Sequence, residues 1–229
     1  MNIKAPVGSG VNQTNNTAVG FNAMEINTTG DHNTGIGGQA LLSNTTGGSN
    51  TALGSSALTF NNVGNRNVAV GRRALVLNAI GSDNVALGYN ALYNSNGNGS
   101  VAIGSEALEF TTTGDSNTAV GTQALQLNTT GDLNTGVGKF AGRSNTTGSS
   151  NTSLGFRAGY SITTASSNTY IGKGAGDLNL GSNNSAVGAD ALGSLSSGGG
   201  NVALGYKAGA EISGGTPNTT STDSVFIGK

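Results

Sequence analysis

Apolar and polar positions along this chain recur at a nearly fixed spacing. A block of the type Asn-Thr-Ala-Val-Gly repeats from residue 16 to residue 228, and its closing glycine marks each repeat. The closing glycines are Gly20, Gly37, Gly54, Gly71, Gly88, Gly104, Gly121, Gly138, Gly155, Gly172, Gly188, Gly205 and Gly228. Nine of their twelve intervals are 17 residues long, two are 16 and the last is 23. Such a short period predicts small units that bury their apolar faces only by stacking on their neighbours.

The residues before each closing glycine follow the pattern of a short β-strand. The residue directly before the glycine is always aliphatic, as in Val19 and Ile36, and the residue two before it is usually small, as in Ala18. Because side chains alternate across a strand, the residues one and three before the glycine share a face. A second short strand fits the Ala-Leu pair after the glycine, as in Ala40 and Leu41.

This pattern excludes a helical repeat. Asn, Thr and Gly disfavour helices, and a 17-residue unit with two glycine turns has no room for a ten-residue helix. We therefore predict an all-β fold, a parallel β-solenoid (β-roll) of 17-residue coils with two short strands per coil. We expect an N-terminal cap or linker at residues 1–15, a repeat array at 16–209, and an atypical last coil with an insertion at 210–229.

Residues at the same position of successive repeats form a column in a stacked array. Two of these columns, one of Asn and one of Ala and Gly, have more than one interpretation. The Asn four residues before most closing glycines, such as Asn33 and Asn50, fits either a stacked amide ladder or a turn residue in the left-handed region. The column of Ala and Gly in the strands fits either a close-packing surface for another chain or the filling of a narrow coil interior.

Composition limits the classes of function. The chain has 40 glycines among 229 residues, 9% charged residues, a net charge of −1 and no cysteine. Neither nucleic acid nor an anionic membrane is indicated as a partner, and disulfides, thiolate zinc sites and cysteine nucleophiles are excluded. No apolar run approaches the roughly 18 residues of a membrane-spanning helix, so we expect no membrane insertion. The first residues contain no apolar segment typical of a secretory signal.

The phrases at residues 84–88 (Asn-Val-Ala-Leu-Gly) and 100–104 (Ser-Val-Ala-Ile-Gly) resemble the head repeats of trimeric autotransporter adhesins. That resemblance implies a left-handed parallel β-roll and a homotrimer. The return loop of the type Asn-Thr-Thr-Gly-Asp is longer than in those adhesins, and this longer variant resembles repeats in bacteriophage tail fibres and injection-system fibres.

The resemblance implies a structural and adhesive segment of a trimeric surface or tail fibre, which presents a surface for a host receptor or glycan. Expected partners are two further copies of the chain, a host cell-surface receptor or glycan, and other fibre or baseplate proteins. The expected location is a virion or an injection-system tail fibre, with the bacterial cell surface as the alternative. Two other functions stay open, an ice-binding solenoid based on the Thr column and a tailspike-like polysaccharide hydrolase.

Bulky residues that vary between repeats follow each closing glycine, and stacking would align them into a cationic and aromatic ridge. Such a ridge suits sugar rings or acidic glycans, although each position alone also fits a solvated turn. The candidate contact residues are Phe21, Arg72, Arg73, Tyr89, Lys139, Phe140, Phe156, Arg157, Lys173, Tyr206 and Lys207.

No catalytic residue, cofactor or metal site is predicted, and we expect the chain not to be an enzyme. The single histidine, His32, lies in a return loop where neighbouring repeats carry other residue types, which indicates a surface substitution. The acidic residues are scattered across the coils without a pair that converges for glycosidic cleavage. No phosphate-binding loop, zinc motif or calcium-binding nonapeptide is present.

Overall fold

The computed structural model describes residues 15–212 and 216–228. The chain divides into two compact units, Met1–Ser116 and Asn117–Lys229, which are called unit 1 and unit 2 below. Most of the predicted N-terminal cap, residues 1–14, lies outside the described residues.

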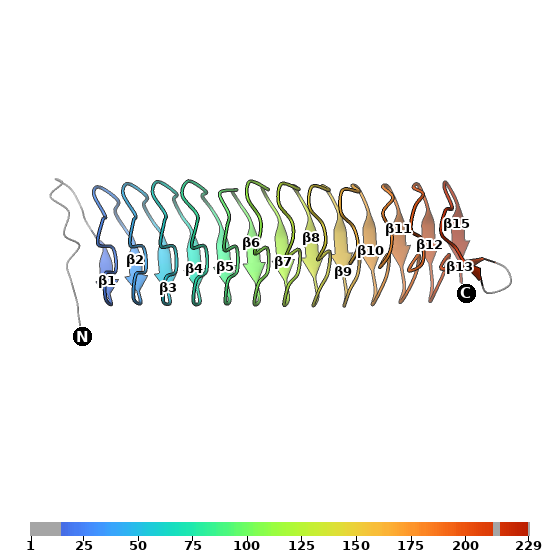
Figure 1. Cartoon of the computed structure of the whole chain (residues 1–229), viewed down its shortest axis with the longest axis horizontal. Helices are drawn as coiled ribbons and strands as arrows, with labels where there is room; N and C mark the ends of the chain where they lie inside the picture. The colour runs from blue at the N-terminus through green and yellow to red at the C-terminus, as the bar shows by residue number, and fades with distance from the viewer. Residues whose placement is uncertain (1–14, 213–215, 229) are drawn as a thin grey trace. The chain divides into compact units, whose positions relative to one another are not determined.

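Unit 1 is a stack of coils in which each coil contributes one three-residue strand, as Figure 1 shows. Its strands pair in parallel in chain order, with equivalent residues side by side, as in Thr17 beside Thr34. They are β1 (Thr17–Val19), β2 (Thr34–Ile36), β3 (Thr51–Leu53), β4 (Val68–Val70), β5 (Val85–Leu87) and β6 (Val101–Ile103).

Unit 2 repeats the same arrangement. Its parallel strands are β7 (Thr118–Val120), β8 (Thr135–Val137), β9 (Thr152–Leu154), β10 (Thr169–Ile171), β11 (Ser185–Val187), β12 (Val202–Leu204) and β15 (Val225–Ile227). Between the last two lies an antiparallel pair, β13 (Glu211–Ile212) and β14 (Thr216–Pro217), within the predicted insertion. The predicted parallel β-solenoid of 17-residue coils is confirmed.

The prediction of a second strand in each coil is wrong. After the closing glycine, every second residue has a positive φ, as in Gln39 (61°) and Leu41 (51°). A β-strand requires negative φ at each residue, so this segment cannot extend as a strand. The segment is nevertheless tied to its neighbours, because Gln39 N–H donates to the Phe21 carbonyl and Leu41 N–H donates to the Ala57 carbonyl. It is a stacked turn, hydrogen-bonded from coil to coil like the strands.

The small column fills the inside of each coil and does not form a surface for another chain. Ala52, in the middle of β3, is fully buried, whereas Leu53 beside it is 46% exposed. The Ala-Leu pairs of the turns fill the interior of the coil opposite the strands. Ala40 and Leu41, for example, are both fully buried. A coil this narrow accommodates one large side chain across from one small one, so the aliphatic residues of the strands point outward. The prediction of a packing surface made of Ala and Gly is therefore wrong, and the narrow-interior interpretation is correct.

The Asn column before the strands forms the amide ladder. Asn50 donates through Nδ2 to the Gly64 carbonyl of the return loop (2.8 Å), and its Oδ1 accepts from the backbone N–H of Asn67 one coil on (2.9 Å). The left-handed conformation belongs to the preceding residue, with φ of 60° at Ser49 and 55° at Arg66. Each amide thus closes its own coil and joins it to the next.

A second buried Asn column, seven residues after the closing glycine, was not recognised in the sequence. Asn44 Nδ2 donates to Asn27 Oδ1 of the preceding coil (2.7 Å) and to the Gly47 carbonyl (2.9 Å). Figure 1 shows the turns and return loops to which these columns belong on either side of the arrows. Each coil has only one short strand, so many backbone groups of its turns and loops lie outside the sheet. The two ladders supply hydrogen-bond partners for some of these groups.

The replacement Asn50→Ala is expected to lower the free energy of unfolding of unit 1 by about 1–3 kcal/mol. It would leave the buried N–H of Asn67 without its acceptor and would remove the bond to Gly64. Urea denaturation followed by circular dichroism measures the change. The control is Ser55→Ala, on the exposed side of the same coil, and equal midpoints for the two variants would contradict a stabilising ladder.

Candidate functional site

The positions that follow the closing glycines lie in two columns that run from coil to coil. The backbone N–H two residues after a glycine donates to the carbonyl one residue after the preceding glycine, as in Gln39 to Phe21 (2.8 Å) and Arg157 to Lys139 (3.1 Å). These bonds hold equivalent side chains in register within each unit. The two columns together are called the ridge below.

The two columns differ in exposure. The candidate residues directly after the glycines are exposed, including Phe21 at 68% and Tyr206 at 55%. The candidate residues two after the glycines are half-buried. The exposed candidates are Phe21, Arg72, Tyr89, Lys139, Phe156, Lys173 and Tyr206, and the half-buried ones are Arg73, Phe140, Arg157 and Lys207. The first column therefore offers contact surface, and the second supports it.

Several cations of the ridge lie over aromatic rings. In unit 1, the Arg73 guanidinium is 4.7 Å from the centre of the Tyr93 ring and donates to the Tyr93 hydroxyl at 2.8 Å. Arg72 lies 5.8 Å from the centre of the Tyr89 ring. Part of the charge of the ridge is thus used within the protein to order the aromatic side chains.

Unit 2 carries the densest aromatic cluster among the described residues. Phe140 lies 6.1 Å from Phe156 and 6.3 Å from Tyr160 between ring centres, the second contact being edge-on. Lys139 lies over Phe140 at 4.8 Å, and Arg157 lies over Tyr160 at 4.5 Å. Contacts of this kind fix the rings in place and leave Phe156 43% exposed.

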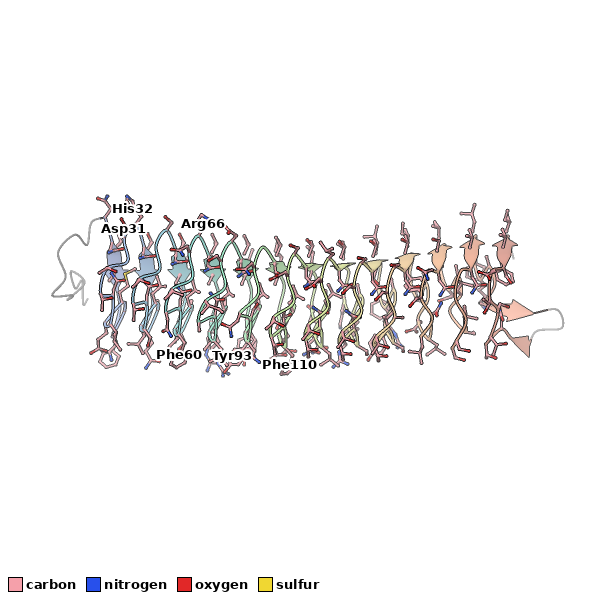
Figure 2. The ribbon with its side chains drawn as sticks, turned by 90° about the horizontal axis from the view of Figure 1, so that it is seen from above. Asp31, His32, Phe60, Arg66, Tyr93 and Phe110 are labelled. Carbon is pink, nitrogen blue, oxygen red and sulfur yellow. The ribbon has the colours of Figure 1, made fainter. Side chains whose placement is uncertain are left out.

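Further aromatic residues of the same edge were missed in the sequence. Tyr93 and Tyr160 lie five residues after their glycines, and Phe60 and Phe110 lie six after. Figure 2 shows Phe60, Tyr93 and Phe110 along one edge of unit 1. The assumption of a second strand obscured this column, because only the turn brings position five back against the ridge. The recurrence of tyrosine at one repeat position was the signal available.

The return loops form the opposite edge of unit 1, where Figure 2 shows Asp31, His32 and Arg66. Arg66 holds Asp83 of the next coil in a two-pronged ion pair, Nε to Oδ1 at 2.6 Å and Nη2 to Oδ2 at 2.8 Å. The hydrogen bond from Arg66 lowers the pKa of the Asp83 carboxyl. His32 is an exposed surface residue, with Nε2 at 3.2 Å from Asn15 Nδ2 and Nδ1 at 3.4 Å from the Asp31 carboxylate.

One pair of acidic residues does converge, which corrects the expectation of scattered carboxylates. Asp177 and Asp190 come from successive coils of unit 2, and both line a groove beside the ridge. The turn geometry explains the error, because it brings position five of one coil towards position two of the next. The sequence spacing of 13 residues gave no sign of this proximity.

The groove, called the unit 2 groove below, consists of two adjoining hollows of 320 and 210 Å³ that share Gly174, Asp177 and Asp190. The larger hollow is lined by Phe156, Arg157, Lys173, Gly174, Asp177 and Asp190. The smaller one extends to Gly193, Lys207 and neighbouring residues.

Charge within the groove is partly compensated. Arg157 Nη2 lies 3.1 Å from Asp177 Oδ2. Burial raises the pKa of the Asp177 carboxyl, the ion pair with Arg157 opposes that increase, and the like charge of Asp190 adds to it. The groove therefore combines two carboxylates, three cations and one partly exposed ring in a small space.

A scan against protein-family models, a search of curated proteins and a search of solved structures each found no match.

The described residues offer neither a cluster of metal ligands nor a membrane-spanning helix. No group of three or more His, Cys, Asp or Glu side chains in 15–212 and 216–228 is arranged to hold a metal ion. Within the same residues, no helix has the length and apolar character needed to cross a membrane.

Proposed function

We propose that the chain is a structural and adhesive segment of a homotrimeric surface or tail fibre, and that its ridge presents a binding surface for a host receptor or glycan. The observation that carries this proposal is the outward face of the strands, called the strand face below. It consists of the residues one and three before each closing glycine.

The strand face carries no charge and is largely aliphatic in each unit. Every outward residue of the parallel strands is Thr, Ser, Val, Ile or Leu. Large aliphatic side chains on it are well exposed, including Leu53 at 46% and Leu87 at 45% in unit 1, and Leu154 at 43% and Leu204 at 53% in unit 2. Within each unit, an exposed and uncharged face of this kind is unusual for a monomeric protein, and it is typical of a protein–protein interface.

Identical copies of the chain suit this face better than an unrelated partner. The face repeats with the period of the coils, so a second copy offers the same period and the same apolar columns. The repeat resemblance implies three copies around one axis and left-handed coils, and three strand faces turned inward would cover their aliphatic side chains. The ridge would then stay at the outer edge, open to a receptor.

Sedimentation equilibrium of the purified chain tests the assembly. We expect a species of three times the 22.4 kDa chain mass. A single species at 22.4 kDa across the micromolar range would contradict the proposal, because an apolar interface of this extent is expected to hold at such concentrations.

The proposed setting follows from the resemblance. Fibre segments of this kind are placed in virions, in injection-system tail fibres or, as the alternative, on bacterial cell surfaces, where other fibre or baseplate proteins are their neighbours. We assign no catalytic step to the chain. Genomic neighbourhood and pull-down with adjacent fibre proteins would test this setting.

An ice-binding solenoid is the second candidate, because the Thr column points outward. In unit 1, Thr17 and Thr51 are exposed on the strand face, and in unit 2 the equivalent Thr residues are half-buried at the surface. The column is interrupted by Val68, Val85 and Val101, and its neighbouring column is wholly aliphatic. An ice-recrystallisation assay is decisive, and we expect no inhibition at micromolar concentrations. Inhibition by the wild-type chain that is lost in Thr51→Lys would favour ice binding over the fibre.

A further inference from the structure

We propose that the unit 2 groove binds one uncharged pyranose ring of a glycan. This inference deepens the proposed function, on which it rests, by naming the site and the class of sugar. Its support comes from the shape of the groove, from the groups that line it and from the sign of their charges.

The shape comes from a local loss of side-chain bulk. Two residues after the closing glycine, most coils carry a larger side chain, such as Gln39 or Phe140, whereas the coil at the groove has Gly174. Five residues after the closing glycine, some coils have a tyrosine, as in Tyr93 and Tyr160. The two coils that follow Gly174 have Gly193 and Ala210 at that position. The missing side chains leave the groove between bulky neighbours. A Cβ on Gly174 would overlap the Asp190 carboxylate, so this glycine leaves room for that carboxylate in the groove.

The lining groups match the surface of a pyranose. Asp177 and Asp190 are acceptors for the hydroxyl hydrogens of a sugar, and Lys173 and Lys207 are donors to its oxygens. The exposed ring of Phe156 at one wall offers an apolar surface for the C–H face of the sugar. The larger hollow, at 320 Å³, lies at the lower end of the range of ligand pockets, which is appropriate for one ring and not for a long oligosaccharide.

The charges favour an uncharged sugar over an acidic or a basic one. An acidic sugar would bring its carboxylate near Asp177 and Asp190, and an amino sugar would bring its ammonium near Arg157, Lys173 and Lys207. An uncharged sugar meets both sets through hydroxyl groups. Arg157 lies 3.1 Å from the Asp177 carboxylate, which orients that carboxylate as an acceptor for a sugar hydroxyl.

The test measures binding of methyl glucopyranoside, galactopyranoside and mannopyranoside, each as α and β anomers, to the full chain by calorimetry and saturation-transfer NMR. Glucuronic acid and glucosamine are the charged comparisons. We expect at least one uncharged glycoside to bind with a Kd of roughly 1–10 mM, as its small number of atoms allows. The charged sugars are expected to bind at least about 10-fold more weakly.

Two variants locate the site. Gly174→Gln fills the groove, and its backbone is compatible because Gln39 and Gln123 occupy the equivalent position with φ of 61° and 56°. Asp190→Asn removes one charged acceptor with little change of shape. Each is expected to weaken binding at least about 10-fold. The matched control is Ser56→Gln in unit 1, at the same repeat position with φ of 58°, which is expected to leave binding unchanged.

The outcomes separate this inference from the function on which it rests. If the wild-type trimer and the Gly174→Gln trimer bind an uncharged glycoside equally well, the groove is not the binding site. That result would leave the fibre proposal intact. Preferential binding of the acidic sugar, or release of reducing ends from an oligosaccharide, would also overturn it. Loss of binding in Gly174→Gln and Asp190→Asn, with retention in Ser56→Gln, supports it whichever assembly sedimentation shows.

Discussion

The replacement Leu87→Glu is expected to convert the proposed homotrimer to monomers while the β-solenoid stays folded. Leu87 lies on the strand face of β5 and is 45% exposed in the single chain, so a glutamate there meets water in a monomer. In a trimer closed through the strand faces it would place three carboxylates in an apolar interface, where each costs several kcal/mol, about 3–5, without a partner. Sedimentation velocity would show the change in mass, and circular dichroism would show the retained fold.

The control for this experiment is Ser55→Glu, which adds the same charge on the ridge side of unit 1. It is expected to leave the trimer intact. A third variant, Leu87→Thr, copies a residue type already present on the strand face and is expected to weaken the trimer only modestly. If Leu87→Glu sediments as a trimer, the strand face is not the interface between copies.

The sequence was sufficient to predict the solenoid because the repeat period and the alternation in the strands are local properties. The registers Thr17 to Thr34 and Thr51 to Val68 follow directly from the 17-residue spacing. The role of the closing glycines was also predictable, since Gly37 has φ of 137° and a Cβ there would overlap the Gly54 carbonyl of the next coil.

The direction in which each strand face points could not be predicted from alternation. Ala52 and Leu53 alternate equally well with either one inside, and hydrophobicity alone would favour burial of the larger one. The width of the coil decides the matter, because the fully buried Leu41 and Leu58 already fill the interior from the turns. That width depends on the left-handed turns. Leu rarely adopts a positive φ, so a Leu in the sequence gives no sign of such a turn.

In the candidate site too, one part could be predicted from the sequence and another could not. The ridge was predictable, because its residues occupy fixed positions after the closing glycines. The unit 2 groove was not, because it arises from side chains that are absent at Gly174 and Gly193 and from a turn that brings Asp177 towards Asp190. A column-by-column reading detects residues that are present, whereas a groove is defined by three-dimensional gaps between them.

Tyr170 stands at the middle position of its strand, where most other coils have a small residue. It is fully buried in β10, and burial raises the pKa of its phenol, which stays neutral near pH 7. Space for the ring comes from Gly159 and Gly176, at positions where Leu is usual, and a Cβ on Gly176 would lie 2.6 Å from Tyr170 Cδ1. Phe226 of β15 is accommodated in the same way by Gly209. An aromatic residue in the strand and a glycine in the turn therefore form a compensating pair.

A double-mutant cycle on Tyr170 and Gly176 is expected to show strong coupling. Tyr170→Ala leaves a cavity and is expected to destabilise unit 2 by about 3–5 kcal/mol. Gly176→Leu inserts a side chain against the Tyr170 ring and is expected to cost about 3 kcal/mol or more. The double variant restores the regular combination, as in Ala86 and Leu92, and the left-handed backbone of Gly176 (φ 60°) suits it, since Leu92 has φ of 49°.

We therefore expect the double variant to recover at least about 2 kcal/mol relative to the sum of the single variants. Because a stacked array can unfold locally, hydrogen exchange of the amides in β9, β10 and β11 is the appropriate measurement, with urea midpoints as a second one. The control pair is Tyr170→Ala with Gly142→Leu. Gly142 lies at the same repeat position against Leu125, so this pair is expected to show no recovery. Additive losses for Tyr170 and Gly176 would mean that the two residues do not compensate each other, and that the solenoid interior adjusts to an aromatic residue by other means.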